Sequence, residues 1–166
     1  MDLGGLGRIQ EATTAPGIGD EAPDFTLRDE TNQKWTLSEH RGRNILLVFY
    51  PLSFSGVCTY ELHEITSRSD KFEAAGAEVV GISVDSKYVQ NAFKQREGLS
   101  ATLLADFNPR GEVARRYGVY MDEWGYANRG TFVIDKNGRI AHKVVTNPTD
   151  ARDPDAYLQA LADCPT

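Results

Sequence analysis

The sequence predicts an α/β domain in which helices flank a central mixed β-sheet. Two observations lead to this prediction. From residue 21 onward, short β-rich runs alternate with segments of helical character, which is the order of strands and helices in α/β domains. Near the C-terminal end, an Asn-Gly pair separates two further β-rich runs and indicates a hairpin. The 166 residues suit one domain with a sizeable core.

The first half of the domain is predicted to contain three strands, a helical turn and a long helix. Ser38 is expected to cap the turn and Gly42 to end it. The third strand (NILLVFY) is almost continuously apolar, which is typical of a central strand covered on both faces. The long helix, which ends at Gly76, is expected to place three side chains in the core: Leu62, Ile65 and Phe72. The predicted ranges are residues 25–28, 34–37, 38–42, 44–50 and 57–75.

The second half is predicted to contain four strands and three helices. Asp85 or Ser86 caps the first helix, Gly98 follows its end, and Pro154 begins the last helix. In the turn of residues 135–138, the Asn-Gly pair predicts two central residues with positive φ. This order is the layout of a thioredoxin-like fold, assigned to residues 19–166 after a flexible N-terminal tail of residues 1–18. The predicted ranges are residues 78–84, 86–95, 102–105, 112–117, 130–134, 139–145 and 154–162.

Composition and charge argue against several classes of function. The formal net charge is −6 and there is no basic stripe, so no nucleic-acid partner is expected. No apolar run approaches the roughly 18 residues of a membrane-spanning helix. The first twenty residues lack the apolar core of an export signal, so a cytoplasmic location is expected. The two cysteines form no CxxC and no metal-ligand cluster, and neither a metal nor a cofactor is predicted.

Cys58 is the candidate nucleophile because of its place in the chain. It follows the buried strand, in the loop or the first turn of the next predicted helix, where backbone N–H groups and the helix dipole stabilise a thiolate. A cysteine taken at random is more often buried and inert. Here the flanking residues favour chemistry: Pro51 lies seven residues before Cys58, the hydroxyl of Ser55 three residues before it, and Glu61 one helical turn after it.

The segment of residues 49–61 (FYPLSFSGVCTYE) resembles the active-site signature of the peroxiredoxins. Residues 19–25 (GDEAPDF) are similar to the opening strand of that family. Residues 129–135 (RGTFVID) are similar to the strand that carries its active-site arginine. The resemblance covers about residues 19–162. Within the family, the chain most resembles the one-cysteine, AhpE-like subgroup, on the patterns at residues 56–58, 127–132 and 150–153.

The resemblance implies a thiol-dependent peroxidase that reduces hydrogen peroxide and organic hydroperoxides, and so serves antioxidant defence and redox homeostasis. The Cys58 thiolate would attack the terminal peroxide oxygen, which releases water or an alcohol and leaves a sulfenic acid. Arg129 would hold the thiolate and the peroxide oxygens. Ser55, at a position where the family usually has Thr, would bridge them through its hydroxyl. Pro51 would shield the sulfur from water, and Glu61 would orient Arg129.

Cys164 leaves two interpretations open. It is either a resolving cysteine that forms a disulfide with Cys58, or a surface thiol near the C-terminus. In the second case an external thiol reduces the sulfenic acid, and the AhpE-like resemblance implies a mycoredoxin, mycothiol or thioredoxin type of reductant. The family also implies a homodimer or higher homo-oligomer. Four aromatic residues are either core or part of such an interface: Tyr117, Tyr120, Trp124 and Tyr126.

Other functions fit the sequence less well. A thiol–disulfide oxidoreductase of the same fold needs CxxC, whereas Thr-Tyr-Glu follows Cys58. A cysteine hydrolase needs a histidine beside its nucleophile, and His63 lies about 140° around the helix from Cys58. The alternative to a peroxidase is a peroxide-responsive redox switch or chaperone without turnover. Catalytic consumption of peroxide with excess dithiol distinguishes the two.

Overall fold

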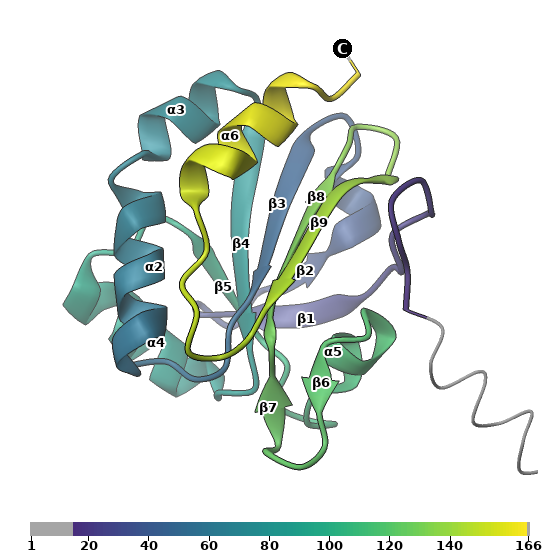
Figure 1. Cartoon of the computed structure of the whole chain (residues 1–166). Coiled ribbons are helices and arrows are strands. Elements are labelled where there is room, and N and C mark those ends of the chain that lie inside the picture. Colours follow the sequence, from purple (N-terminus) through teal and green to yellow (C-terminus); the bar gives the residue numbers. More distant parts are fainter. Residues whose placement is uncertain (1–14, 166) are drawn as a thin grey trace, which may run out of the picture.

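The centre of the protein is a seven-stranded mixed sheet, shown in the computed structural model of Figure 1, which describes residues 15–165. The strands are β1 (Thr26–Asp29), β2 (Lys34–Thr36), β3 (Asn44–Phe49), β4 (Ala77–Ser83), β5 (Thr102–Ala105), β8 (Arg129–Ile134) and β9 (Ile140–Thr146). They follow the order β2-β1-β5-β4-β3-β8-β9. Strands β3, β4 and β5 are parallel, and the remaining pairs are antiparallel.

Helices cover both faces of this sheet (Figure 1). One face carries α2 (Gly56–Thr66), α3 (Ser69–Ala74), α4 (Lys87–Glu97) and α6 (Pro154–Ala162), and the other carries α5 (Glu112–Arg116). Buried side chains form one apolar cluster on each side of the sheet. The predicted mixed sheet flanked by helices is therefore confirmed.

Strand β3 explains how the candidate nucleophile is positioned. All six of its residues are buried, and from Ile45 to Phe49 successive side chains point alternately into the two apolar clusters, as the apolar run predicts. Strand β8 is antiparallel to β3, with Thr131 opposite Val48. The first residue of β8, Arg129, consequently lies beside the end of β3, where the loop into α2 begins.

The prediction of one long helix over residues 57–75 is wrong in one respect, because the structure has two helices there. Helix α2 ends at Thr66 and α3 begins at Ser69. The hydroxyl of Ser67 donates to the carbonyl of Glu64 at 2.8 Å, and so satisfies one of the carbonyls that a helix end leaves free. The three predicted core side chains are nevertheless all buried: Leu62, Ile65 and Phe72.

Most of the predicted helix ends are confirmed, and one is wrong. Ser38 does not cap the turn after β2; it lies inside the 3₁₀ helix η1 (Leu37–His40), and its N–H donates to Asp24 Oδ1 at 2.9 Å. That carboxylate supplies the acceptor that a capping side chain would otherwise provide. The confirmed signals are Ser86 as the cap of α4, Gly98 as its left-handed C-terminal residue and Pro154 as the first residue of α6.

The turn between β8 and β9 also differs from the prediction. Of the Asn-Gly pair, Gly138 alone has a positive φ, of 83°. The carboxylate of Asp135 accepts the N–H groups of Asn137 at 2.9 Å and of Arg139 at 3.1 Å. An aspartate at the first position of the turn therefore closes it in place of two left-handed central residues.

A short hairpin after α5 was not predicted. It pairs β6 (Tyr120–Met121) with β7 (Tyr126–Ala127). The four aromatic residues of this region have different environments, so they are not one group. Tyr117 is fully buried in the core, Tyr120 and Tyr126 are half-buried, and Trp124 is exposed.

Most of the predicted N-terminal tail, residues 1–14, lies outside the described residues. The first described residues contact β9, since the carbonyl of Pro16 accepts a hydrogen bond from Lys143 Nζ at 2.9 Å. A domain boundary at residue 19 stays a prediction. Within residues 15–165, no helix is both long enough and apolar enough to cross a membrane.

Candidate active site

Cys58 is the third residue of α2 and is completely buried. The first turn of a helix has backbone N–H groups without helical acceptors, and these groups carry the positive end of the helix dipole. Ser55 precedes the helix in an extended conformation, with φ −71° and ψ 152°. The sulfur is therefore withdrawn from water at a place where the backbone stabilises negative charge, as the sequence predicts.

Arg129 is brought to the sulfur by the antiparallel pairing of β8 with β3. Its Nη2 donates to Cys58 Sγ at 3.2 Å, and its Nη1 donates to Glu61 Oε1 at 2.6 Å. The third donor, Nε, binds the carbonyl of Pro148 at 2.6 Å. Three acceptors in three directions fix the guanidinium plane, and its charge faces the sulfur.

A second arginine, Arg152, completes this cluster, and the sequence reasoning missed it. Its backbone N and its Nε donate to Glu61 Oε2 at 2.6 and 2.9 Å, and its Nη2 donates to Glu61 Oε1 at 2.9 Å. Its Nη1 reaches the carbonyls of Phe49 and Gly130 and the hydroxyl of Thr131. Arg152 thereby ties the segment before α6 to the ends of β3 and β8, beside the candidate nucleophile.

Glu61 is held as a carboxylate between the two guanidinium groups. Its side chain is 4% exposed, and those of Arg129 and Arg152 are each 2% exposed. Burial alone would raise the pKa of Glu61, but the hydrogen bonds from Arg152 and the charges of both arginines outweigh it and hold this pKa below its usual value. One buried carboxylate neutralises one of two buried cations. The guanidinium of Arg129, which faces the Cys58 sulfur, carries the positive charge that remains.

Ser55 and Pro51 belong to the loop that leads into α2, and neither has a hydrogen bond to the sulfur. The hydroxyl of Ser55 donates to the carbonyl of Leu52 at 2.9 Å. Pro51 is buried. Of the five predicted site residues, the structure thus joins Cys58, Arg129 and Glu61 by hydrogen bonds and places Ser55 and Pro51 next to them in the chain. The predicted bridge from Ser55 to the thiolate is not formed in this structure.

Phe54, in the same loop, has a strained backbone. Its φ is +69°, a conformation that costs a residue with a side chain roughly 1–2 kcal/mol. Its ring, which is 45% exposed, packs against Phe93 of α4 with centroids 4.9 Å apart. A loop in this conformation needs contacts that hold it there.

Cys164 is not the surface thiol that one interpretation predicted. It is buried, and its Sγ donates to the carbonyl of Ala160 at 3.4 Å. Burial raises the pKa of the Cys164 thiol, and the charges of Asp135 and Asp163 add to this. Asp135 follows the last residue of β8, whereas Cys58 lies against the first. The C-terminal end of the chain and the start of α2 lie at opposite ends of the sheet (Figure 1).

His63 has a partner of its own away from Cys58. Its Nε2 lies 2.8 Å from Glu97 Oε2 of α4. The imidazole of His63, which a cysteine hydrolase would need as a base beside Cys58, therefore contacts the Glu97 carboxylate instead. This agrees with the angle of about 140° that separates the two residues around the helix.

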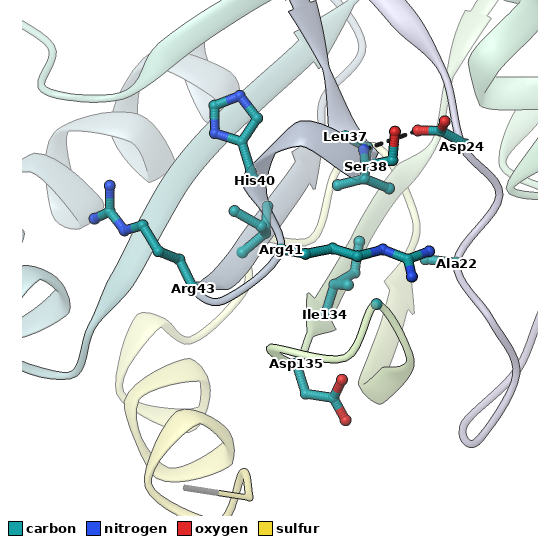
Figure 2. A pocket seen from close by; sticks show the side chains of 11 residues that line it. Ala22, Asp24, Leu37, Ser38, His40, Arg41, Arg43, Ile134 and Asp135 are labelled. Atoms are coloured by element: carbon teal, nitrogen blue, oxygen red, sulfur yellow. Dashed lines mark hydrogen bonds between the residues drawn. The ribbon is translucent and has the colours of Figure 1, made fainter.

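A hollow at the far end of the sheet offers no competing site. Figure 2 shows it among residues of η1 and the turn after β8, and its volume of ≈ 10 Å³ has room for about one water. Its polar side chains already have partners. Asp24 accepts from the N–H of Ser38, His40 Nδ1 lies 2.8 Å from Glu78 Oε2, and Arg41 donates to Glu21 at 3.0 Å.

Comparisons with known proteins agree with this arrangement. A model of the AhpC/TSA family matches residues 18–143. Alkyl hydroperoxide reductase E of Mycobacterium tuberculosis is 40% identical over 146 residues, which cover 87% of this chain and 95% of that protein. Peroxiredoxin-2 of Mus musculus is 35% identical over 154 residues, which cover 87% of this chain and 77% of the relative.

Solved structures give the same result for the fold. The reduced 2-Cys peroxiredoxin of Plasmodium vivax superposes with a TM-score of 0.80 and 31% identity, covering 87% of this chain and 80% of that one. Peroxidoxin BcpB of Mycobacterium tuberculosis superposes with a TM-score of 0.81 and 28% identity, covering 91% and 99%. The resemblance stated from the sequence and the thioredoxin-like fold are both confirmed.

Proposed function

The chain belongs to the AhpC/TSA family of peroxiredoxins and is a thiol-dependent peroxidase, and we propose that Cys58 is its peroxidatic residue. The observation that carries this assignment is the 3.2 Å hydrogen bond from Arg129 to a fully buried Cys58 sulfur. The thiolate attacks the terminal oxygen of a hydroperoxide and the O–O bond breaks. The departing oxygen takes a proton and leaves as water or an alcohol, and the sulfur becomes a sulfenic acid.

Arg129 contributes more than ionisation of the thiol. Converting an ordinary thiol fully to thiolate at neutral pH gains only about thirtyfold, and nucleophilicity falls as the thiol becomes more acidic. The rest of the acceleration comes from placing the O–O bond in line with the sulfur and from stabilising charge on the departing oxygen. Arg129 does both, Glu61 and Arg152 hold it in place, and Pro51 keeps water from the sulfur. The Ser55 hydroxyl still has free lone pairs, which accept a hydrogen bond from the O–H of the hydroperoxide.

The reductant of the sulfenic acid is an external thiol of the mycoredoxin, mycothiol or thioredoxin type. Cys164 lies near the end of β8 opposite to Cys58, and the six residues of that strand span about 16 Å. A disulfide needs Cα atoms within about 7 Å of each other. Because both described cysteines are free thiols, we place the enzyme in the cytoplasm, where thiols are kept reduced.

Intact mass after one equivalent of hydrogen peroxide tests this proposal. We expect wild type and Cys164→Ser each to gain one oxygen on Cys58, as a species that a sulfenic-acid reagent traps. A loss of two hydrogens in wild type, replaced by an added oxygen in Cys164→Ser, would make Cys164 the resolving cysteine. No rapid change at Cys58 in either protein would contradict the assignment of the peroxidatic residue.

We propose further that two copies of the chain form a homodimer at the edge of the sheet where α2 and α4 begin. An exposed aromatic ring follows each of the three parallel strands: Phe54 after β3, Tyr88 after β4 and Phe107 after β5. The exposed fractions are 45%, 76% and 55%. Parallel strands end at the same edge of a sheet, so these rings surround one edge, and gathered apolar surface of this kind is typical of an interface.

Sedimentation velocity tests the homodimer. Wild type is expected at twice the chain mass of 18.4 kDa, and the double variant Tyr88→Glu with Phe107→Glu as a monomer, because carboxylates cannot be buried unpaired. Val145→Glu is the matched control, since Val145 is an exposed apolar residue of the edge strand β9. A monomeric wild type, or a control that dissociates equally, contradicts this proposal.

A further inference from the structure

The loop of residues 51–55 is attached to the next strand–helix connection by a single carboxylate. Asp85, between β4 and α4, accepts the backbone N–H of Ser53 on its Oδ2 at 2.7 Å. Strands β3 and β4 are parallel, so the loop before α2 and the connection before α4 leave the sheet at the same edge. The distance is at the short end of the range for N–H···O bonds.

Asp85 is itself held by a buried pair of side chains. Ser83 Oγ donates to Asp85 Oδ2 at 2.6 Å, and it accepts from Gln90 Nε2 at 3.0 Å and from the N–H of Asp85 at 3.3 Å. A hydroxyl has one proton, so with two donors already directed at its oxygen, that proton is committed to Asp85. Gln90 is fixed in turn by its second hydrogen bond, to the carbonyl of Leu104 at 2.7 Å.

The contacts on the other side of Ser53 show what this carboxylate constrains. The hydroxyl of Ser53 lies 3.1 Å from the hydroxyl of Tyr50, the residue just after β3. The next residue, Phe54, has the strained positive φ, and Ser55 follows as the extended residue just before α2. The N–H that Asp85 holds is therefore one residue before the strained position and five before Cys58.

We propose that Asp85 is a positioning residue for the peroxidase reaction: it holds the loop in the conformation that places Ser55 and the first turn of α2 around the Cys58 sulfur. The inference rests on the proposed function of Cys58. Without the carboxylate, the Ser53 N–H has no partner and Phe54 relaxes toward negative φ, which moves Ser55 away from the peroxide. Displacements of about 1 Å can cost about 100-fold in rate. Alkylation of Cys58 by iodoacetamide needs no aligned O–O bond, so its rate does not depend on the loop conformation that places Ser55 near the peroxide.

The test compares two rates in the same set of variants: oxidation of reduced Cys58 by an organic hydroperoxide in stopped flow, and its alkylation by iodoacetamide. Asp85→Ala is expected to slow oxidation at least tenfold while alkylation changes less than threefold. Asp85→Asn is expected to restore oxidation to within threefold of wild type, because its amide oxygen accepts the same two hydrogen bonds. Ser83→Ala frees Asp85 to rotate, so its oxidation rate is expected to lie between those of Asp85→Ala and Asp85→Asn. It takes the place of Asp85→Ala in the test if that variant does not fold.

Asp106→Ala is the matched control, because Asp106 also accepts two backbone N–H groups, from Val113 and Ala114, but does so at the start of α5. It is expected to lose stability and to keep both rates. The inference is overturned if Asp85→Ala and Ser83→Ala oxidise within twofold of wild type, if Asp85→Asn is as slow as Asp85→Ala, or if Asp106→Ala slows oxidation equally. A wild type whose Cys58 does not react rapidly with hydroperoxide would instead contradict the proposed function.

Discussion

Replacing Arg129 by lysine is expected to lower kcat/KM for hydroperoxides about 10²- to 10³-fold, although the charge is kept. Arg129 makes three hydrogen bonds in three directions, to Cys58, Glu61 and the carbonyl of Pro148. An ammonium group is a compact donor at the end of a flexible chain and does not reproduce this planar fork. Loss of one donor to developing negative charge costs about 10²- to 10³-fold in other enzymes.

Stopped-flow measurement of peroxide consumption checks this expectation, with Arg116→Lys as the matched control. Arg116 also makes hydrogen bonds through its guanidinium, to Glu112 and to the carbonyl of Asp24, but it is about half exposed on α5. The control is expected within twofold of wild type. If Arg129→Lys were also within twofold, positive charge alone would suffice and the geometric role assigned to Arg129 would be wrong.

The order of strands and helices could be predicted from the sequence because the local pattern of apolar and polar residues indicates each element. A strand buried on both faces has to be apolar throughout, and β3 is. The break between α2 and α3 was missed because Leu62, Ile65 and Phe72 keep facing the core across it. What ends α2 is a set of polar bonds around Ser67, and apolar periodicity carries no information about them. The prediction for the turn at Asp135 was wrong for a similar reason. The Asp135 carboxylate closes the turn by accepting two backbone N–H groups, so the turn does not need the backbone conformation that Asn-Gly favours.

The candidate site was predictable where its residues are close to Cys58 in sequence or belong to a family motif. Glu61 is one helical turn from Cys58, and Arg129 begins a strand that resembles the family pattern. Arg152 contacts Glu61 across 91 positions, and no local rule predicts that an arginine before a helix will be buried. One signal was present: the Asp150–Asp153 pattern matched the AhpE-like subgroup, but no role was attached to its arginine. A buried carboxylate facing Arg129 alone would have left Oε2 without a partner, which is the physical argument that requires a second donor.

Glu61→Gln is expected to lower the free energy of unfolding by about 3–5 kcal/mol at neutral pH, because it leaves two buried guanidinium groups without their counter-ion. Glu64→Gln is the matched control on the same helix. Glu64 pairs with Arg68 at the surface, with 35% of its side chain exposed, and its loss is expected to cost less than about 1 kcal/mol. Urea unfolding at pH 7 measures both. A cost below about 1 kcal/mol for Glu61→Gln would show that the cluster does not stabilise the fold through this carboxylate.

The pH dependence of the same comparison tests the charge of Glu61. Its pKa in the folded protein lies below the ordinary value of 4.5, so unfolding raises this pKa and the unfolded chain binds the proton more tightly. The stabilisation from the ionised carboxylate is therefore complete above about pH 5.5 and declines as the pH falls below 4.5 through the folded pKa. The difference in unfolding free energy between wild type and Glu61→Gln should be constant from about pH 6 to 8 and should shrink in acid. A difference that grew as the pH fell would mean that the pKa of Glu61 is higher in the folded protein than in the unfolded chain, and the two arginines would then not be what holds this carboxylate ionised.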